Sequence, residues 1–245
     1  MRKSWGKVAL VSFILVLLIS QASAMVYTTA EAGTTITIYN MELWGKNDHD
    51  VTAPNFSQAS VDPNNKIIKA RAYTSFGIPF VSPTQQVASG YLGVPVCIRP
   101  KVQTINCRIR VTFDGSYNGL IGALGVAAGV VKFKGILRSY NPEYHFPAQE
   151  FTLLETGAGG LPSGAISGTF NKSFEVNARV GEDWVNEIKF EVYVASGTST
   201  MKTLGVCDND FYTDNRYVKL NWIKVENLGP AVERPGGGGG GQRYR

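Results

Sequence analysis

The sequence predicts an all-β fold, an antiparallel β-sandwich of the jelly-roll kind. Apolar and polar residues alternate with a period of two along much of residues 25–230, and turn-forming residues recur between the alternating segments. The same region shows no helical stripe with capping residues. Such alternation buries one face of a strand and leaves the other in water, as in stacked antiparallel sheets.

The first 24 residues have the organisation of a secretory signal peptide. A basic stretch holds Arg2, Lys3 and Lys7, an uncharged, mostly apolar run covers Val8 to Ile19, and small residues end the segment at Ala22-Ser23-Ala24. A bilayer-spanning helix needs about 20 apolar residues, so this run predicts a cleaved signal rather than an anchor. No later segment could span a membrane, and we expect a secreted or cell-surface protein.

The charge balance argues against a nucleic-acid partner. The chain has 24 Lys and Arg residues against 19 Asp and Glu, but three of the basic residues lie in the signal segment. The mature chain is therefore nearly neutral. Its basic residues are scattered, whereas a nucleic-acid-binding surface concentrates them in a stripe or patch.

One sandwich domain is expected over residues 25–230. Its alternating segments are residues 34–39, 68–72, 108–113, 131–137, 174–180, 188–194 and 218–222. After Trp222 the alternation changes phase, which predicts either a bulge or a strand covered on both faces. The succession of strands and loops in residues 174–225 resembles the closing strands of secreted jelly-roll modules, and this resemblance concerns architecture alone.

Three segments depart from the strand pattern. Residues 47–63 are polar and contain proline, which predicts a long loop after the first strand. Residues 119–131 are uncharged and rich in Gly, Ala and Val; they are typical of a buried strand whose glycines permit close approach or a bulge. Residues 231–245 contain six consecutive glycines and end in Arg-Tyr-Arg, which predicts a flexible, disordered tail.

The first strand, Thr34 to Met41, has two potential partners. It can pair within its own sheet, which we favour, or it can insert into the open edge of a neighbouring molecule. The second arrangement would make the protein a surface filament or assembly subunit.

Three cysteines are present, Cys97, Cys107 and Cys207. An exported chain favours disulfides, and the short spacing between Cys97 and Cys107 predicts a bridge between two adjacent strands. Cys207 is then left unpaired. A cysteine–histidine metal site is not expected, because neither His49 nor His145 has ligand spacing to a cysteine.

An acidic segment covers residues 208–215. Asp208, Asp210 and Asp214 supply the oxygen ligands that calcium prefers, which makes calcium the one candidate cofactor. The segment lacks the spacing of an EF-hand, and Asp and Asn are also the usual residues of turns. We favour a turn between the last two strands. A second acidic segment, residues 47–50 with His49, reads as a solvated loop.

Two aromatic residues are candidates for stacking on sugar rings. Trp184 follows Gly181-Glu182-Asp183 in a predicted turn, and Tyr212 lies in the acidic segment. Trp222 instead shares the parity of the core residues of its strand. An exposed aromatic beside carboxylates and amides suits a glycan or another surface ligand.

Enzymatic activity is not predicted. The sequence contains no G-x-S-x-G motif, and only His49 and His145 could serve as bases for a serine nucleophile. A glycosidase would need two facing carboxylates, for which Glu150, Glu155, Glu175, Glu182, Asp183, Glu187 and Glu191 are available. Lys189 between Glu187 and Glu191 favours a charge-balanced exposed face. We therefore expect a non-enzymatic structural or ligand-binding protein, with a secreted glycan-acting hydrolase as the alternative.

Two sequons would accept N-linked glycans in an exported protein. They begin at Asn55, in the predicted loop, and at Asn171. We expect Asn55 to be the better acceptor because loops are accessible.

Overall fold

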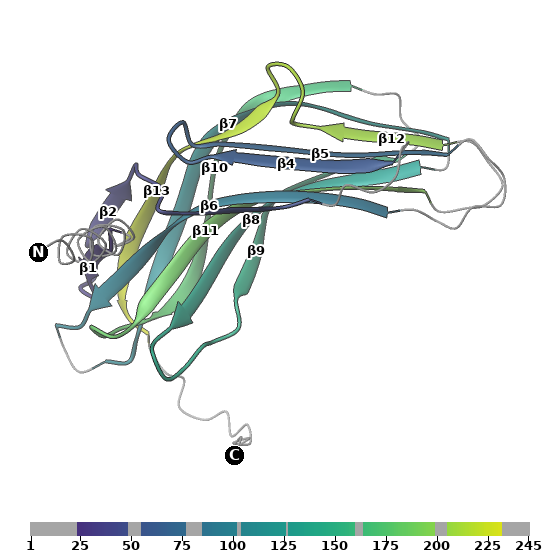
Figure 1. Ribbon diagram of the computed structural model, residues 1–245. Helices are drawn as coiled ribbons and strands as arrows, with labels where there is room; N and C mark the ends of the chain where they lie inside the picture. Colours follow the sequence, from purple (N-terminus) through teal and green to yellow (C-terminus); the bar gives the residue numbers. More distant parts are fainter. Residues whose placement is uncertain are drawn as a thin grey trace, which may run out of the picture.

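The computed structural model describes residues 24–48, 55–76, 85–101, 104–125, 127–159, 164–198 and 205–231. The predicted signal peptide (apart from Ala24), the tail beyond residue 231 and His49 lie outside these residues. Figure 1 shows the described chain as two layers of strands. The strands are β1 (Val26–Thr29), β2 (Thr35–Ile38), β3 (Leu43–Asn47), β4 (Phe56–Asp62), β5 (Ile67–Phe76), β6 (Gln85–Arg99), β7 (Asn106–Gly125), β8 (Ala127–Tyr140), β9 (Gln149–Gly159), β10 (Gly164–Arg179), β11 (Val185–Thr198), β12 (Gly205–Asp210) and β13 (Tyr217–Pro230).

The strand order defines a jelly roll. Sheet A has the order β6–β11–β8–β9, with β1 and β3 both pairing with β6 at its edge. In sheet B, β7 lies beside β10, and β12 and β13 together fill the place between β7 and β5. The antiparallel pairs β5 with β12 and β13, β6 with β11, β7 with β10, and β8 with β9 form one long hairpin rolled across two sheets. The predicted fold class is confirmed.

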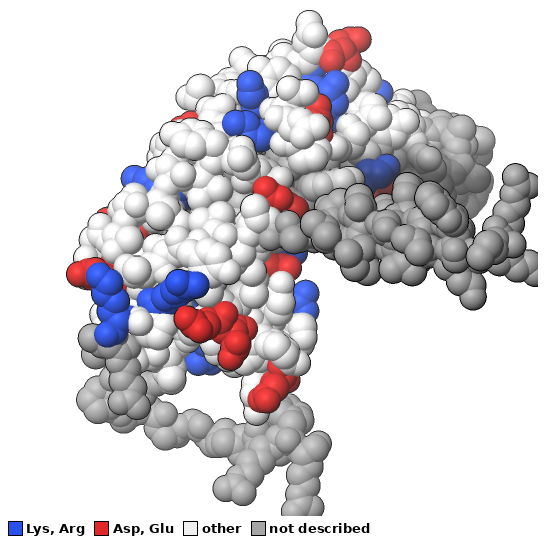
Figure 2. All heavy atoms as spheres, turned by 60° about the vertical axis from the view of Figure 1, so that its left-hand side comes forward, with Lys and Arg blue, Asp and Glu red and all other residues white. Residues whose placement is uncertain are grey.

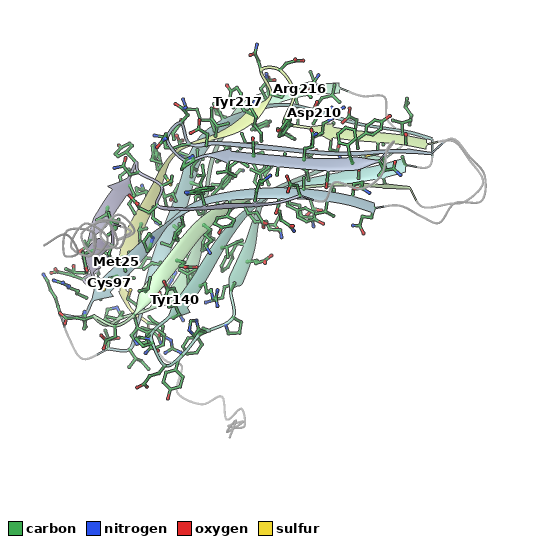
Figure 3. The ribbon with its side chains drawn as sticks, in the orientation of Figure 1. Met25, Cys97, Tyr140, Asp210, Arg216 and Tyr217 are labelled. Atoms are coloured by element: carbon green, nitrogen blue, oxygen red, sulfur yellow. The ribbon has the colours of Figure 1, made fainter. Side chains whose placement is uncertain are left out.

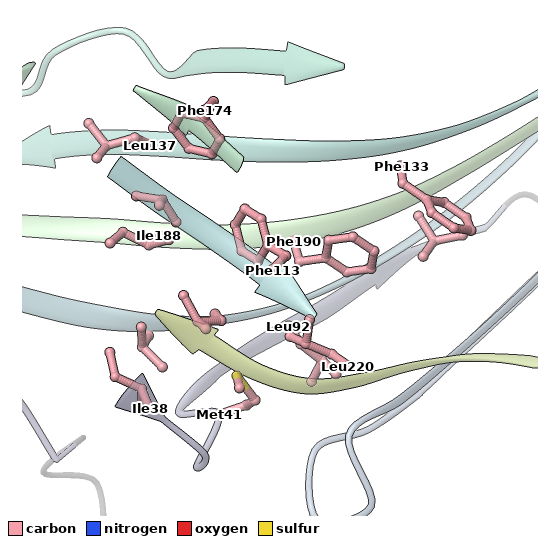
Figure 4. Close-up of a cluster of buried hydrophobic side chains, with 14 of the residues drawn as sticks. Ile38, Met41, Leu92, Phe113, Phe133, Leu137, Phe174, Ile188, Phe190 and Leu220 are labelled. Atoms are coloured by element: carbon pink, nitrogen blue, oxygen red, sulfur yellow. The ribbon is translucent and has the colours of Figure 1, made fainter. Parts of the chain in front are cut away.

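The core lies between the sheets and is rich in phenylalanine. Phe190 of sheet A has its ring centroid 5.5 Å from that of Phe113 and 5.1 Å from that of Phe170, both from sheet B. Figure 4 shows Phe113, Phe133 and Phe190 gathered with Leu92 and Leu220 from both layers. Alternate residues of the predicted segments point into this cluster, as their alternation requires. Trp222 is the exception: it is half-buried and lies outside the cluster, so its predicted core position is wrong.

Glycine brings chain segments into close approach where the sequence predicted it. A Cβ at Gly119 would lie 2.4 Å from the Phe211 ring, and one at Gly129 would lie 2.0 Å from Asn209 Nδ2. The 119–131 segment forms the end of β7 and the start of β8, so its strand character is confirmed. It is not one buried strand, because it belongs to two strands and Leu124 and Ala128 are exposed.

The phase change at Trp222 is a bulge. The pairing of β13 with β7 shifts register between Leu220 and Trp222, which leaves Asn221 as the extra residue. Ile223 and Val225 return to the buried face beyond the bulge. The loop predicted over residues 47–63 is wrong in its second half, because β4 occupies Phe56–Asp62 and pairs with β5.

The N-terminal segment pairs within its own chain. β1 runs parallel to β6 at the edge of sheet A, and β2 pairs with β13 in sheet B. Asn227 is fully buried and stabilises the connection between β1 and β2 by hydrogen bonds. Its side chain donates to Thr28 Oγ1 at 3.1 Å, and its backbone N donates to the Thr34 carbonyl at 2.8 Å. The expected own-sheet pairing of the first strand is confirmed.

The predicted Cys97–Cys107 disulfide is wrong. Both residues are free buried thiols, as is Cys207. The connection between them crosses from sheet A to sheet B instead of joining adjacent strands of one sheet. Cys97 lies beneath the 181–184 turn, with Sγ 3.3 Å from the Gly181 carbonyl oxygen, whereas Cys107 belongs to the core between the sheets.

Among the described residues, no helix has the length and apolarity that a membrane span requires. Charged side chains of both signs are scattered in small groups over the face in Figure 2, which shows no continuous basic stripe there.

Candidate functional site

Aromatic side chains gather at one end of the sandwich, where the β8–β9 connection meets the β10–β11 turn. We call this group the aromatic end, and it comprises Tyr140, Tyr144, His145, Phe146, Arg179 and Trp184. Of these, the sequence singled out Trp184 as a binding residue. Tyr140 and Cys97, labelled in Figure 3, mark this end of the molecule.

The turn that carries Trp184 depends on Gly181. Gly181 has φ +146°, a conformation that side chains rarely adopt, and a Cβ there would lie 3.0 Å from Trp184 Cδ1. Its N–H donates to the Ile98 carbonyl of β6 at 2.9 Å, and the Trp184 N–H donates back to the Gly181 carbonyl at 3.3 Å. The turn thereby fixes Trp184 against the end of sheet A.

The β8–β9 connection is shaped by Asn141. Its Oδ1 accepts hydrogen bonds from the backbone N–H groups of Glu143 and Tyr144, at 3.0 and 2.6 Å. This turn brings His145 back against Tyr140, where the two rings stack with centroids 5.5 Å apart and planes 3° apart. Phe146 follows, with its N–H bonded to the Ser139 carbonyl at 3.0 Å.

Arg179 joins the two loops. Its guanidinium carbon lies 4.3 Å from the centroid of the Phe146 ring and 5.7 Å from that of Trp184. The two rings are themselves 5.6 Å apart and tilted by 36°. The aromatic end is therefore a packed surface in which Arg179 connects the two loops.

Asn186, which is fully buried, supports this surface from below. Its Oδ1 accepts hydrogen bonds from Ser139 Oγ at 2.7 Å and from the Arg179 N–H at 3.2 Å, and its Nδ2 donates to the Arg179 carbonyl at 2.9 Å. One side chain thus links β8, β10 and β11 directly beneath the aromatic residues. The position of Arg179 is set by this buried amide.

The outermost part of the aromatic end is accessible. Tyr144 is 60% exposed and Phe146 is 37% exposed, whereas Trp184 is half-buried. Exposed carboxylates of Glu143, Glu182 and Asp183 lie in the same two loops. Aromatic faces bordered by hydrogen-bonding groups are suited to ligands that have both apolar faces and hydroxyl groups.

Sequence reasoning missed Phe146, Arg179 and Tyr144 at this site. The run Tyr144-His145-Phe146 directly after Asn141-Pro142 was a usable signal, since large aromatics in a turn are candidates for a surface role. Arg179 gave no such signal, because it closes an alternating strand like any other outward-facing charge.

Tyr212 lies elsewhere. It follows Asp210, which Figure 3 places with Arg216 and Tyr217 far from Tyr140 and Cys97. The structure therefore separates the two aromatic residues, Trp184 and Tyr212, that the sequence proposed as one ligand-binding set.

The acidic segment forms a network of ion pairs. Asp208 accepts two hydrogen bonds from Arg71, at 3.0 and 2.9 Å. Asp210, fully buried, accepts the N–H groups of Tyr212 and Thr213 at 2.7 and 3.0 Å, and it also binds the side chains of Thr213 and Arg216. Asp208 and Asp210 end strand β12, and the predicted turn follows them at residues 211–216.

These bonds occupy the carboxylate oxygens that a metal ion would need as ligands. Asp208 and Asp210 are committed to arginines, and Asp214 is exposed in the turn with φ 52°. Within the ranges that the structure describes, no group of three or more His, Cys, Asp or Glu side chains is arranged to hold a metal. The arrangement gives the calcium hypothesis no support.

The carboxylates considered for a hydrolase are mostly ion-paired. Glu187 pairs with Lys189 at 2.8 Å, and Lys134 lies 3.1 Å from Glu150 and 3.5 Å from Glu191. The charge-balanced face predicted around Lys189 is present, but the side chains of Glu187, Lys189 and Glu191 are only 15–19% exposed. Lys189 Nζ lies 4.9 Å from the centroid of the Tyr91 ring, and Lys134 Nζ lies 5.0 Å from the centroid of the Tyr193 ring.

The two sequon asparagines differ in accessibility. Asn55 is half-buried, and its Oδ1 accepts the Ser75 N–H at 2.8 Å. Asn171 is exposed on β10, and its Nδ2 lies 3.2 Å from Asp114 Oδ1. Geometry thus favours Asn171, in contrast to the expectation from the sequence.

A shallow hollow of about 380 Å³ lies beside the N-terminal strands. It is lined by Ala24, Val26, Ile36, Thr37, Ile38, Tyr39, Asn40 and Glu42. The hollow is separate from the aromatic end, and its lining is mostly apolar.

No protein-family model matches the chain, and no curated protein matches it. Among solved structures, it is similar to a family 11 carbohydrate-binding module from Clostridium thermocellum, in complex with a beta-1,3-1,4-mixed-linked tetrasaccharide. The identity is 9% and the TM-score 0.26, over 82% of this chain and 99% of that one. It is also similar to the Eiger TNF from S. frugiperda, with 10% identity and a TM-score of 0.25, over 84% and 99%. At these TM-scores neither likeness bears on function, and the fold class rests on the strand order.

Proposed function

We propose that this protein is an exported, non-enzymatic β-sandwich that binds carbohydrate at its aromatic end. The observation that supports the proposal is the packing of Phe146, Arg179 and Trp184, with the side chains of Phe146 and Tyr144 exposed to solvent. Pyranose rings present apolar C–H faces that pack on aromatic rings, while their hydroxyl groups need hydrogen-bonding partners at the rim.

The rim offers such partners. The carboxylates of Glu143, Glu182 and Asp183 are exposed and can accept hydrogen bonds from hydroxyl groups. Because Asn186 and Gly181 fix the two loops, a ligand would meet a surface that needs little ordering on binding.

Glycan binding is tested with an array of neutral oligosaccharides, followed by calorimetry with the best hit. Trp184→Ala and Phe146→Ala are each expected to weaken binding at least about tenfold, since a buried aromatic contact contributes on the order of 1–2 kcal/mol. Trp44→Ala is the matched control, because Trp44 is 57% exposed on β3 and lies outside the site. A wild-type protein that binds no glycan, or a Trp44→Ala loss equal to that of Trp184→Ala, would refute the proposal.

Export and the absence of enzymatic activity are tested separately. We expect the mature protein recovered from the producing cells to begin at Met25, as N-terminal sequencing would show. Incubation with the glycans it binds should release no new reducing ends. Reducing-end release that Glu182→Gln or Asp183→Asn abolishes would establish the hydrolase alternative instead.

A further inference from the structure

The interior of the sandwich has an unusual polar region away from the phenylalanine core. Thr74 Oγ1, Ser196 Oγ and Asn209 Oδ1 are buried and have no hydrogen-bond partner within the described part of the chain. The three residues are 0%, 2% and 0% exposed. Glu187 Oε2 also has no hydrogen-bond partner, but it lies 2.8 Å from Lys189 Nζ and its charge is paired.

The strand register brings the three residues together. In sheet B, Thr74 of β5 is paired with Cys207 of β12, and Asn209 follows on the same face two residues later. In sheet A, Ser196 of β11 is paired with Gly129 of β8. A Cβ on Gly129 would lie 2.0 Å from Asn209 Nδ2 and 2.6 Å from Cys207 Sγ, so the two sheets touch at this point.

The amide of Asn209 has a defined orientation. Nδ2 donates to the Ala195 carbonyl at 2.8 Å, across the interface between the sheets, and lies 3.6 Å from Cys207 Sγ. Exchanging Nδ2 and Oδ1 would place Oδ1 against the Ala195 carbonyl oxygen, and both atoms are acceptors. Oδ1 must therefore point away from that carbonyl. It therefore faces the polar region with its lone pairs unused.

Unpaired polar groups in such a place are costly. A buried hydroxyl or amide oxygen that lacks a partner loses its bonds to water, and native proteins nearly always satisfy such groups. The site has no free charge, because the neighbouring carboxylates of Asp208 and Asp210 bind arginines. A neutral molecule that both donates and accepts hydrogen bonds matches this set of two hydroxyls and one amide oxygen.

We propose that ordered water is bound between the sheets at this site, hydrogen-bonded to Thr74, Ser196 and Asn209. A buried water typically makes about three hydrogen bonds, which is the number of unused polar atoms available. The water would extend the Asn209–Ala195 contact into a polar bridge between β5, β11 and β12.

Thermal unfolding of Thr74→Val tests the proposal by the sign of the shift. Valine keeps the shape of threonine and removes the hydroxyl. If that hydroxyl binds water, the Tm falls by about 2–4 °C, whereas an unpaired hydroxyl gives an unchanged or higher Tm. Ser139→Ala is the matched control, because Ser139 Oγ is buried and donates a hydrogen bond to Asn186 Oδ1 at 2.7 Å. The Tm of the Ser139→Ala variant must fall.

A high-resolution crystal structure of the whole chain gives the second measurement. Water density within hydrogen-bonding distance of at least two of the three atoms supports the proposal. Density surrounded by five or six oxygens at cation distances, or direct hydrogen bonds among the three side chains, overturns it. An unchanged or raised Tm in both Thr74→Val and Ser196→Ala overturns it equally.

Discussion

Asp210 stabilises the end of sheet B as a single buried carboxylate. It receives two backbone N–H groups, the hydroxyl of Thr213 and the guanidinium of Arg216, while Arg71 lies 3.6 Å away. Burial works to raise the pKa of Asp210, yet these hydrogen bonds and the charge of Arg71 outweigh it and hold that pKa below its ordinary value of 3.8.

A depressed pKa makes stability depend on pH. The Asp210 contribution is fully present above the unfolded-state pKa near 3.8 and is lost as the pH falls through the lower folded-state pKa. Asp210→Asn should therefore lower the free energy of unfolding at pH 7, by about 3 kcal/mol for a broken buried pair. Urea unfolding from pH 7 to pH 2 checks this, and the variant should show a shallower decline below pH 4. A decline as steep as in the wild type would contradict the assignment.

Asn186 has a comparable role beneath the aromatic end. Asn186→Ala leaves three polar groups of Ser139 and Arg179 without partners, so unfolding free energy should fall by about 2–3 kcal/mol. Asn177→Ala is the control, because Asn177 is exposed on β10 and its loss should be nearly neutral. Equal stabilities for the two variants in urea would show that Asn186 does not support the site.

At the scale of the strand, close contacts between backbones decide which substitutions the fold accepts. Gly115 lies where β7, β10 and β13 meet. A Cβ there would be 2.2 Å from the Lys219 carbonyl oxygen and 2.4 Å from the Phe170 ring. Because the nearest atom belongs to the backbone of β13, the strand itself would have to move.

Gly115→Ala should consequently destabilise the protein by about 2–3 kcal/mol through overpacking. Gly164→Ala provides the comparison, since a Cβ at Gly164 meets nothing within 4 Å and should change the unfolding free energy by less than about 0.5 kcal/mol. Chemical denaturation of both variants measures the difference. Similar values would mean that β13 adapts to the extra methyl group at little cost.

Strand β6 shows why part of the fold escaped prediction. Pro95 interrupts its sequence pattern, and proline usually argues against a central strand. In the structure β3 pairs with β6 up to Gly93 and β1 pairs from Val96, so the residue without an N–H falls between the two partners. The alternating strands were predictable because each has one solvent-exposed face. Strand β6 is instead buried on both faces, so apolar and polar residues do not alternate along it.

The aromatic end was predictable only in part for a related reason. Trp184 was recognisable from its turn, and Arg179 ends the strand that leads into that turn. Phe146 comes from the β8–β9 connection, which only the rolled topology brings to Trp184. The same topology separated Tyr212 from Trp184 and Cys97 from Cys107. The periodicity of a strand predicts which of its residues face the core. Which residues of different strands lie side by side depends on the order of the strands in the sheets.

For the whole molecule, stability rests on the core and not on a covalent bridge. Burial raises the pKa of the Cys97 thiol, and it raises those of Cys107 and Cys207 to about 11. We expect the same Tm with and without a reducing agent, and slow reaction of all three thiols with a thiol reagent until the protein unfolds. A Tm that drops on reduction would reveal a disulfide.

The position of β13 has a consequence for the time at which the protein can fold. β13 pairs with β2, β5 and β7, so sheet B lacks a central strand until the last part of the domain has been synthesised. A chain that emerges from the ribosome N-terminus first therefore cannot close its sandwich early. Its native pairings join residues that are far apart in the sequence, which makes folding a slow event that follows the synthesis of β13.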